Sequence, residues 1–210
     1  MIIIRSNHDL QTSYLYYYTN PIINFANKKG YKVIVLETEK EISEINLRKR
    51  IKTKKPKFIF FNGHGTASAL LGVKKEIFVD TNSADIFNGT ITFVRACDSL
   101  RLLGEQAVKK GCLSFIGYKN KFIIARQHNK TCKPEIDPIA KPALECSNLV
   151  MIELLNGRNV KEAIESSHNA ASDNILDLVY SNEPWAGASL QALVYNDAFL
   201  DFKGDAEAKF

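Results

Sequence analysis

The stretch from Phe58 to Gly65 constrains the fold more than any other part of this chain. It begins with an apolar run, Phe58 to Phe61, that is too short for a helix and ends abruptly in Asn62-Gly63-His64-Gly65. This pattern predicts a buried strand that delivers a histidine at its carboxyl end. The two glycines allow a sharp turn and a close approach of backbone to ligand.

A second unit of the same build follows along the chain. The apolar run Ile91 to Val94 leads into Arg95-Ala96-Cys97-Asp98-Ser99, and a helical pattern starts at Leu100. If the two strands are parallel neighbours, their carboxyl ends meet at one edge of a sheet. We therefore expect His64 and Cys97 to emerge side by side.

Strand-like and helix-like segments alternate through the rest of the chain. We expect strands at 2–4, 32–36, 58–61, 91–94 and 113–118, and helices at 11–29 (with a kink or break at Pro21), 41–51, 100–110, 143–156 and 160–171 or beyond. The alternation predicts an α/β fold with a mostly parallel, doubly wound sheet and helices on both faces. In the strand order 2-1-3-4-5, Asn7, His64 and Cys97 share the ligand-binding edge.

Other segments are less regular. Residues 67–79 suggest a small hairpin, and residues 190–202 alternate as a strand or hairpin before a polar tail, 203–210. The stretch 119–142 contains three prolines, which predicts a long loop that is functional or flexible. We expect one domain, 1–210.

Composition excludes several classes of function. With 45% hydrophobic and 24% charged residues, the chain has the composition of an ordinary globular protein. It shows neither a signal peptide nor an apolar run long enough for a membrane span. We therefore expect a cytoplasmic protein. The net charge of +5 comes largely from the run 48–57, which lacks aromatic residues, so nucleic-acid binding is disfavoured.

The cysteines do not indicate a metal site or a disulfide scaffold. Cys97, Cys112, Cys132 and Cys146 have the spacing of neither, and we expect reduced thiols. His128, Cys132 and Cys146 could contribute to a zinc site, but a fourth ligand is not evident. We therefore predict no metal and no cofactor.

The residues expected at the sheet edge near His64 and Cys97 are of the types found in sites of nucleophilic catalysis. Cys97 precedes a predicted helix, whose free N–H groups favour a thiolate, and His64 is suited to exchange a proton at cellular pH. The backbone N–H groups of Gly65 and Cys97 are candidates for an oxyanion hole, and Asn7 is the candidate to orient the imidazole. A single strand-end cysteine or His-Gly turn is more often structural, but the joint pattern favours catalysis.

The segments Phe60 to Gly65 and Val94 to Ser99 resemble the caspase-like cysteine peptidases, the clan that holds caspases, legumains, gingipains, clostripain and separase. The segments 103–118, 154–163 and 200–205 are similar to prokaryotic gingipain-type members. The resemblance implies the three-layer caspase–hemoglobinase fold and a cysteine endopeptidase that works through a Cys97 thioester. Legumains supply an asparagine to the histidine from a Ser-Asn pair, which Ser6-Asn7 matches.

The chain also departs from that family. His64 and Cys97 are 33 positions apart (97 − 64), against about 50 in caspases, so this is not a caspase proper. In relatives the residue two before the cysteine points into the S1 pocket, which implies that Arg95 selects an acidic P1 residue. Alternatively, Arg95 pairs with an internal acid such as Asp9 or Asp98. Trp185 lines a subsite or belongs to the core.

The resemblance leaves two function classes open. The first is a peptidase acting on a protein or peptide substrate, controlled by an activating partner or by oligomerisation. In such an enzyme the loop 119–142 would build subsites or be cleaved on activation. The second is a catalytically silent, caspase-fold module that binds or regulates another protein.

Overall fold

The structure, a computed structural model, describes residues 1–210 except for the side chain of Asn129. Across the described residues, six strands form one sheet in the order β2-β1-β3-β6-β7-β8. These are β1 (Ile2–Arg5), β2 (Ile34–Leu36), β3 (Phe58–Asn62), β6 (Ile91–Arg95), β7 (Ser114–Tyr118) and β8 (Leu200–Gly204). Neighbours from β2 to β7 pair in parallel, and β8 is an antiparallel edge strand. The prediction of a mostly parallel, doubly wound α/β sheet is confirmed.

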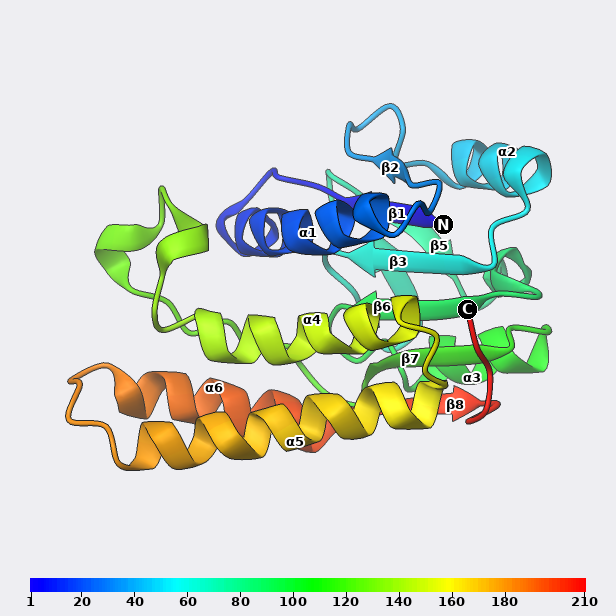
Figure 1. The fold of residues 1–210 in the computed structure, drawn as a ribbon. Helices are drawn as coiled ribbons and strands as arrows, with labels where there is room; N and C mark the ends of the chain where they lie inside the picture. Colours follow the sequence, from blue (N-terminus) through cyan, green and yellow to red (C-terminus); the bar gives the residue numbers. More distant parts are fainter.

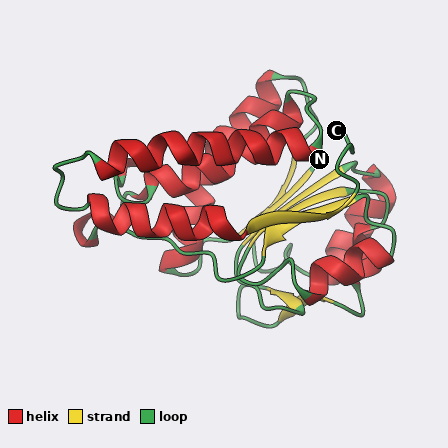
Figure 2. Ribbon diagram, turned by 90° about the horizontal axis from the view of Figure 1, so that it is seen from below, coloured by secondary structure: helices red, strands yellow, loops and turns green.

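Helices cover both faces of this sheet (Figures 1 and 2). They are α1 (Leu10–Lys28), α2 (Glu44–Lys54), α3 (Leu102–Lys109), α4 (Lys141–Leu155), α5 (Val160–Val179) and α6 (Ala186–Phe199), with short 3-10 turns at Ala84–Phe87, His128–Lys130 and Pro134–Ile136. The predicted hairpin is confirmed as β4 (Ala69–Leu71) and β5 (Ile77–Asp80). No helix in the described part of the chain has the length and apolar character needed to cross a bilayer.

The two cores follow from the alternation of side chains along buried strands. On β3, Phe58 and Phe60 join the core under α1, α4 and the start of α5, whereas Ile59 and Phe61 join the core under α2, α3 and the hairpin. A third, smaller cluster lies among α4, α5 and α6. Figure 2 shows these long helices extending past the sheet, which places the helical layer beside its carboxyl edge.

Pro21 does not break α1, which continues to Lys28. A proline inside a helix leaves nearby carbonyl groups without their usual donors. Here the carbonyl oxygen of Tyr18 accepts a hydrogen bond of 2.7 Å from the side-chain amide of Asn148 on α4. The carbonyl that loses its helical donor to Pro21 is that of Tyr17, so the bond to Tyr18 joins α1 to α4 and does not replace the missing one.

The C-terminal region differs from its predicted form. The expected strand or hairpin at 190–202 is instead the end of α6 followed by β8. The buried positions Ser189, Ala192, Leu193 and Asn196 have the spacing of a helix, which outweighs the partial alternation in the sequence. The tail is also packed rather than free, because Phe210 contacts the rings of Tyr31 and Phe58.

The long segment 119–142 is held in place by a buried carboxylate. Asp137 is fully buried and accepts hydrogen bonds from the hydroxyl of Tyr14 (2.5 Å) and from the backbone N–H groups of Gln127 (2.8 Å) and Ile139 (2.9 Å). Nearer the start of the segment, the backbone N–H of Ile123 donates to the side-chain oxygen of Asn196 on α6, and the side-chain nitrogen of Asn196 donates to the carbonyl of Ile123. The loop therefore has a defined path over the ends of α1 and α6.

The contact between α5 and α6 includes a titratable pair. Nδ1 of His168 lies 2.7 Å from Oδ1 of Asp197, and this hydrogen bond raises the pKa of His168 against the opposing effect of burial. Because the folded-state pKa is raised, the stabilisation is complete below the unfolded value, about 6.5, and is lost as pH rises through the folded value.

We therefore expect the difference in melting temperature between wild type and His168→Gln to shrink as pH rises from about 6 to about 9. Asp197→Asn is the companion variant and should show the same trend. Thermal denaturation across this range measures the effect. A difference that stays constant with pH would show that the pair contributes packing only.

Candidate active site

The backbone register brings the loops that follow β3 and β6 together. Asn62 and Arg95 are the last paired residues of the two parallel strands, and the N–H of Gly63 continues the pairing to the carbonyl of Arg95. His64 and Cys97 are each two positions beyond that pair. Both residues lie beyond the paired segments, His64 in a loop and Cys97 in a turn, so the register places the starts of their two loops side by side at the sheet edge where Asn62 and Arg95 face α1 and α4.

Two further contacts hold these loops against each other. A Cβ atom at Gly65 would lie 2.9 Å from Cβ of Ala96 and 3.1 Å from the carbonyl oxygen of Cys97, so only glycine fits here without a shift. The carbonyl of Ala67 accepts hydrogen bonds from the first backbone N–H groups of α3, at Leu102 (3.0 Å) and Leu103 (2.8 Å). The histidine loop thus caps the helix that follows the cysteine.

Asp9 is the residue that binds His64. Its Oδ2 lies 2.5 Å from Nε2 of His64, while its Oδ1 accepts the backbone N–H of Thr12 at 2.8 Å as part of the capping box that starts α1. Burial would raise the pKa of Asp9, but the hydrogen bonds from Thr12 and His64 outweigh it and lower the pKa to about 2. The carboxylate therefore stays charged beside the imidazole at any physiological pH.

Asn7, the sequence-based candidate for this role, is exposed, and no hydrogen bond joins it to His64 among the described residues. The turn after β1 directs Asp9, two residues later, toward the imidazole instead. A signal was present in the sequence: Asp9 and Thr12 have the spacing of a helix N-cap and its N3 partner. A carboxylate at that position necessarily lies at the carboxyl edge of β1.

Cys97 is half-buried, and the segment after it is a turn rather than a helix. The helix α3 starts at Leu102, not at the predicted Leu100, and neither Asp98 nor Ser99 caps it with a side chain. Asp98 has a φ of 55°, an uncommon conformation for a residue with a side chain. Its N–H donates to the carbonyl of Asn120 at 2.9 Å, which ties the cysteine turn to the strand-end loop after β7.

The two N–H groups predicted for an oxyanion hole are available. Gly65 and Leu70 face each other in an isolated bridge whose hydrogen bonds come from Thr66 and Leu71, not from Gly65. Within the described part of the chain, the N–H groups of Gly65 and Cys97 donate to no other protein group. Neither N–H group is therefore occupied by a protein acceptor.

Arg95 is placed differently from both sequence-based interpretations. It is completely buried and donates to the side chains of Asn62 (2.7 Å), Asn148 (2.8 Å) and Thr19 (3.4 Å), with no bond to Asp9 or Asp98 among the described contacts. Burial lowers its pKa to about 10. The guanidinium connects β3, β6, α1 and α4 and does not face a substrate.

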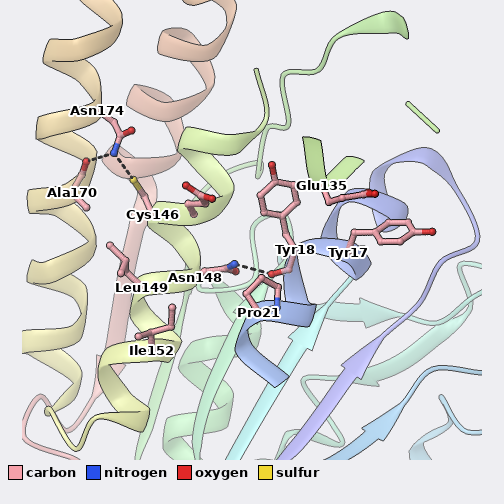
Figure 3. Close-up of a pocket in the computed structure, with 11 residues that line it drawn as sticks. Tyr17, Tyr18, Pro21, Glu135, Cys146, Asn148, Leu149, Ile152, Ala170 and Asn174 are labelled. Carbon is pink, nitrogen blue, oxygen red and sulfur yellow. Dashed lines mark hydrogen bonds between the residues drawn. The ribbon is translucent and has the colours of Figure 1, made fainter. Parts of the chain in front are cut away.

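Trp185 lies in the turn between α5 and α6, where it is partly buried against the cluster among α4, α5 and α6. A hollow of about 400 Å³ opens between α1, α4 and α5 (Figure 3). Its lining includes Tyr17, Tyr18, Glu135, Cys146, Asn148 and Asn174. Neither member of the candidate dyad lines this hollow.

All four cysteines are free, as predicted. Burial raises the pKa of the Cys112 thiol to about 11 and that of Cys146 to about 12, so both stay protonated. Cys132 is exposed.

Among the described side chains, three metal-binding groups approach one another only at His8, Asp9 and His64, so the considered site at His128, Cys132 and Cys146 does not form.

Comparison with protein-family models finds no family that matches the chain, and comparison with curated proteins finds no relative.

Substitution of Asp9 separates its two roles. Asparagine is as good an N-cap as aspartate, so Asp9→Asn should keep the melting temperature close to wild type while removing the charge that orients His64. Asp9→Ala should lose both and cost about 1 kcal/mol of stability. Thermal denaturation, with the ring NMR signals of His64 as a direct report on its protonation, distinguishes the variants. Identical His64 signals in Asp9→Asn and wild type would contradict the pairing.

Gly65→Ala should push the two loops apart and destabilise the fold by about 1–3 kcal/mol, as overpacking does elsewhere. Gly187→Ala is the matched control, because no atom lies within 4 Å of a Cβ there and the residue is in the first turn of α6. That control should be neutral or slightly stabilising. Urea unfolding measures both, and equal stabilities would mean that the loops do not touch at Gly65.

Proposed function

We propose that the protein is a caspase-like cysteine endopeptidase with Cys97 as nucleophile and His64 as general acid and base. The observation that supports this most is the register of β3 and β6, which pairs Asn62 with Arg95 and so starts the loops that carry His64 and Cys97 side by side at one edge of the sheet. The strand order β2-β1-β3-β6-β7 is compatible with the three-layer caspase–hemoglobinase fold.

The chemistry follows from the ring nitrogens of His64. Nε2 donates to Asp9, so Nδ1 is the atom that exchanges protons. The Cys97 thiol passes its proton to Nδ1, and the thiolate attacks the carbonyl carbon of the scissile peptide bond. As the C–N bond breaks, Nδ1 returns the proton to the departing amine and a thioester remains on Cys97. Water, deprotonated by Nδ1, then hydrolyses the thioester and restores the thiol.

The negative charge that develops on the substrate oxygen requires donors that are already in place. The unengaged N–H groups of Gly65 and Cys97 fill this role in our proposal. Asp9 acts as a positioning residue, because its hydrogen bond to Nε2 holds the imidazole in one tautomer and orientation.

The proposal does not include a preference for acidic P1 residues. Its intended determinant, Arg95, is buried and bonded to three neutral side chains. The substrate is a peptide or protein, and control by an activating partner or by oligomerisation is part of the hypothesis, because an unregulated peptidase would damage its host. A reducing compartment such as the cytoplasm fits four free thiols.

The alternative is a catalytically silent module that keeps the fold and binds another protein. The observation in its favour is the partly exposed apolar strip on α6, which includes Leu190, Val194, Tyr195 and Phe199. Chemical reactivity of Cys97 separates the two hypotheses, since a binding module has no need for an activated thiol.

We expect an electrophilic peptide probe to label Cys97 in a Cys132→Ser background, which removes the other accessible thiol. Cleavage of a peptide library should be abolished by Cys97→Ala and reduced at least about 10²-fold by His64→Ala, since His64 supplies the proton transfers. Circular dichroism confirms that each variant is folded. Absence of both labelling and cleavage in wild type would favour the binding module, and cleavage that survives Cys97→Ala would refute the mechanism.

A further inference from the structure

The proposed mechanism leaves one neighbouring group unused. His8 packs edge-on against the ring of His64, with ring centroids 5.7 Å apart, and its side chain is only 17% exposed. Nδ1 of His8 contacts the hydroxyl of Ser6 at 3.0 Å, but Nε2 is buried and has no hydrogen-bond partner in the described structure. A buried polar atom without a partner is unfavourable and often marks the place of an ion or water.

The atom that faces this nitrogen is the same oxygen that binds His64. Oδ2 of Asp9 lies 3.6 Å from Nε2 of His8, which is too long for a hydrogen bond, and 2.5 Å from Nε2 of His64. All three atoms lie within 4.8 Å of one another. Two imidazole nitrogens and one carboxylate oxygen thus lie close together, as the ligands of one ion would.

We propose that His8, Asp9 and His64 form a binding site for a divalent transition-metal ion, with Zn²⁺ as the best-matched ion. Zn²⁺ takes nitrogen ligands at about 2.0–2.1 Å and carboxylate oxygens at about 2.0–2.2 Å, which sets ligand separations of roughly 3.3 Å in a tetrahedral site. The present separations lie on either side of this value. A small rotation of the two rings, His8 inward and His64 outward, forms the site.

The surrounding contacts suit this role. Metal-binding histidines usually have their second ring nitrogen hydrogen-bonded, and Ser6 does this for His8. The other oxygen of Asp9 is held by Thr12 in the α1 capping box, so Oδ2 is already aimed at the two rings. Three protein ligands leave a fourth position for water or another exogenous ligand, as in open zinc sites.

The functional consequence depends on the proposed peptidase activity. A metal ion on Nε2 of His64 replaces the hydrogen bond to Asp9 and confines the single ring proton to Nδ1. The imidazole then cannot accept the proton of the Cys97 thiol. Zinc would therefore inhibit turnover reversibly without contacting Cys97, and a chelator would restore it.

Binding is tested first and without reference to activity. Chelator-treated wild type is titrated with Co²⁺ and then with Zn²⁺, by visible absorption and calorimetry, beside His8→Gln. His168→Gln is the matched control, because His168 also pairs with an aspartate but has no third ligand. We expect one ion per wild-type chain, binding at least about tenfold weaker in His8→Gln, and no change in His168→Gln.

Three results would overturn the site: no saturable binding by wild type, equal weakening in both histidine variants, or an intense thiolate-to-cobalt band that disappears in Cys97→Ala. The activity arm then addresses regulation. Zn²⁺ should inhibit peptide cleavage by wild type at least about tenfold more strongly than cleavage by His8→Gln, each compared with its own metal-free turnover. Equal inhibition of both would refute regulation through this site, whereas absence of any turnover would count against the peptidase alone, because the binding arm stands separately.

Discussion

The parallel pairing of β3 with β6 is the constraint on which the candidate site depends. A shift of one residue in this pairing would turn every side chain beyond it to the opposite face. The register is held at Asn62 and Arg95 by the backbone ladder and by the bond from the Arg95 guanidinium to the Asn62 side chain. Beyond the ladder, the packing of Gly65 on Ala96 continues it. These contacts bring together the backbones of the two loops that carry His64 and Cys97.

Asp9 couples the stability of α1 to the chemistry of the edge. One carboxylate oxygen caps the helix, and the other faces the imidazoles of His64 and His8. The helix therefore begins where the site needs a fixed negative charge. The same arrangement makes the imidazole sensitive to anything that competes for that oxygen, and a metal ion is the competitor that the nearby His8 nitrogen favours.

Arg95 illustrates how an interior polar network can occupy the place of a specificity residue. A buried guanidinium is costly to desolvate, and no carboxylate among its described contacts offsets that cost. Its acceptors are instead neutral oxygens from β3, α1 and α4, with the ring of Phe60 5.4 Å away. Such a network favours one packing of these elements, because the guanidinium finds its three acceptors only in that arrangement, although the side-chain nitrogen of Asn62 stays buried without a partner in the described structure.

Much of the fold was predictable from local pattern. The short apolar runs, the turn residues and the alternation of elements indicated the strands, their edge and the pairing of His64 with Cys97 in one region. The α6 helix was missed because its apolar positions also fit a partial alternation of period two, and only its packing against α4 and α5 distinguishes the two.

The sequence by itself determined the layered sheet and the two loops that meet at its carboxyl edge, since periodicity and turn chemistry are local properties. The tertiary structure alone decided that Asp9 rather than Asn7 binds His64, and that His8 lies beside these two residues. It also decided that Arg95 points into the protein interior. Those outcomes depend on contacts between residues far apart in the chain, such as Asp9 with His64 and Arg95 with Asn148. Side-chain direction at a loop is set by such partners, and the linear pattern, although it marks Asp9 as a helix N-cap, does not indicate which distant residue that side chain contacts.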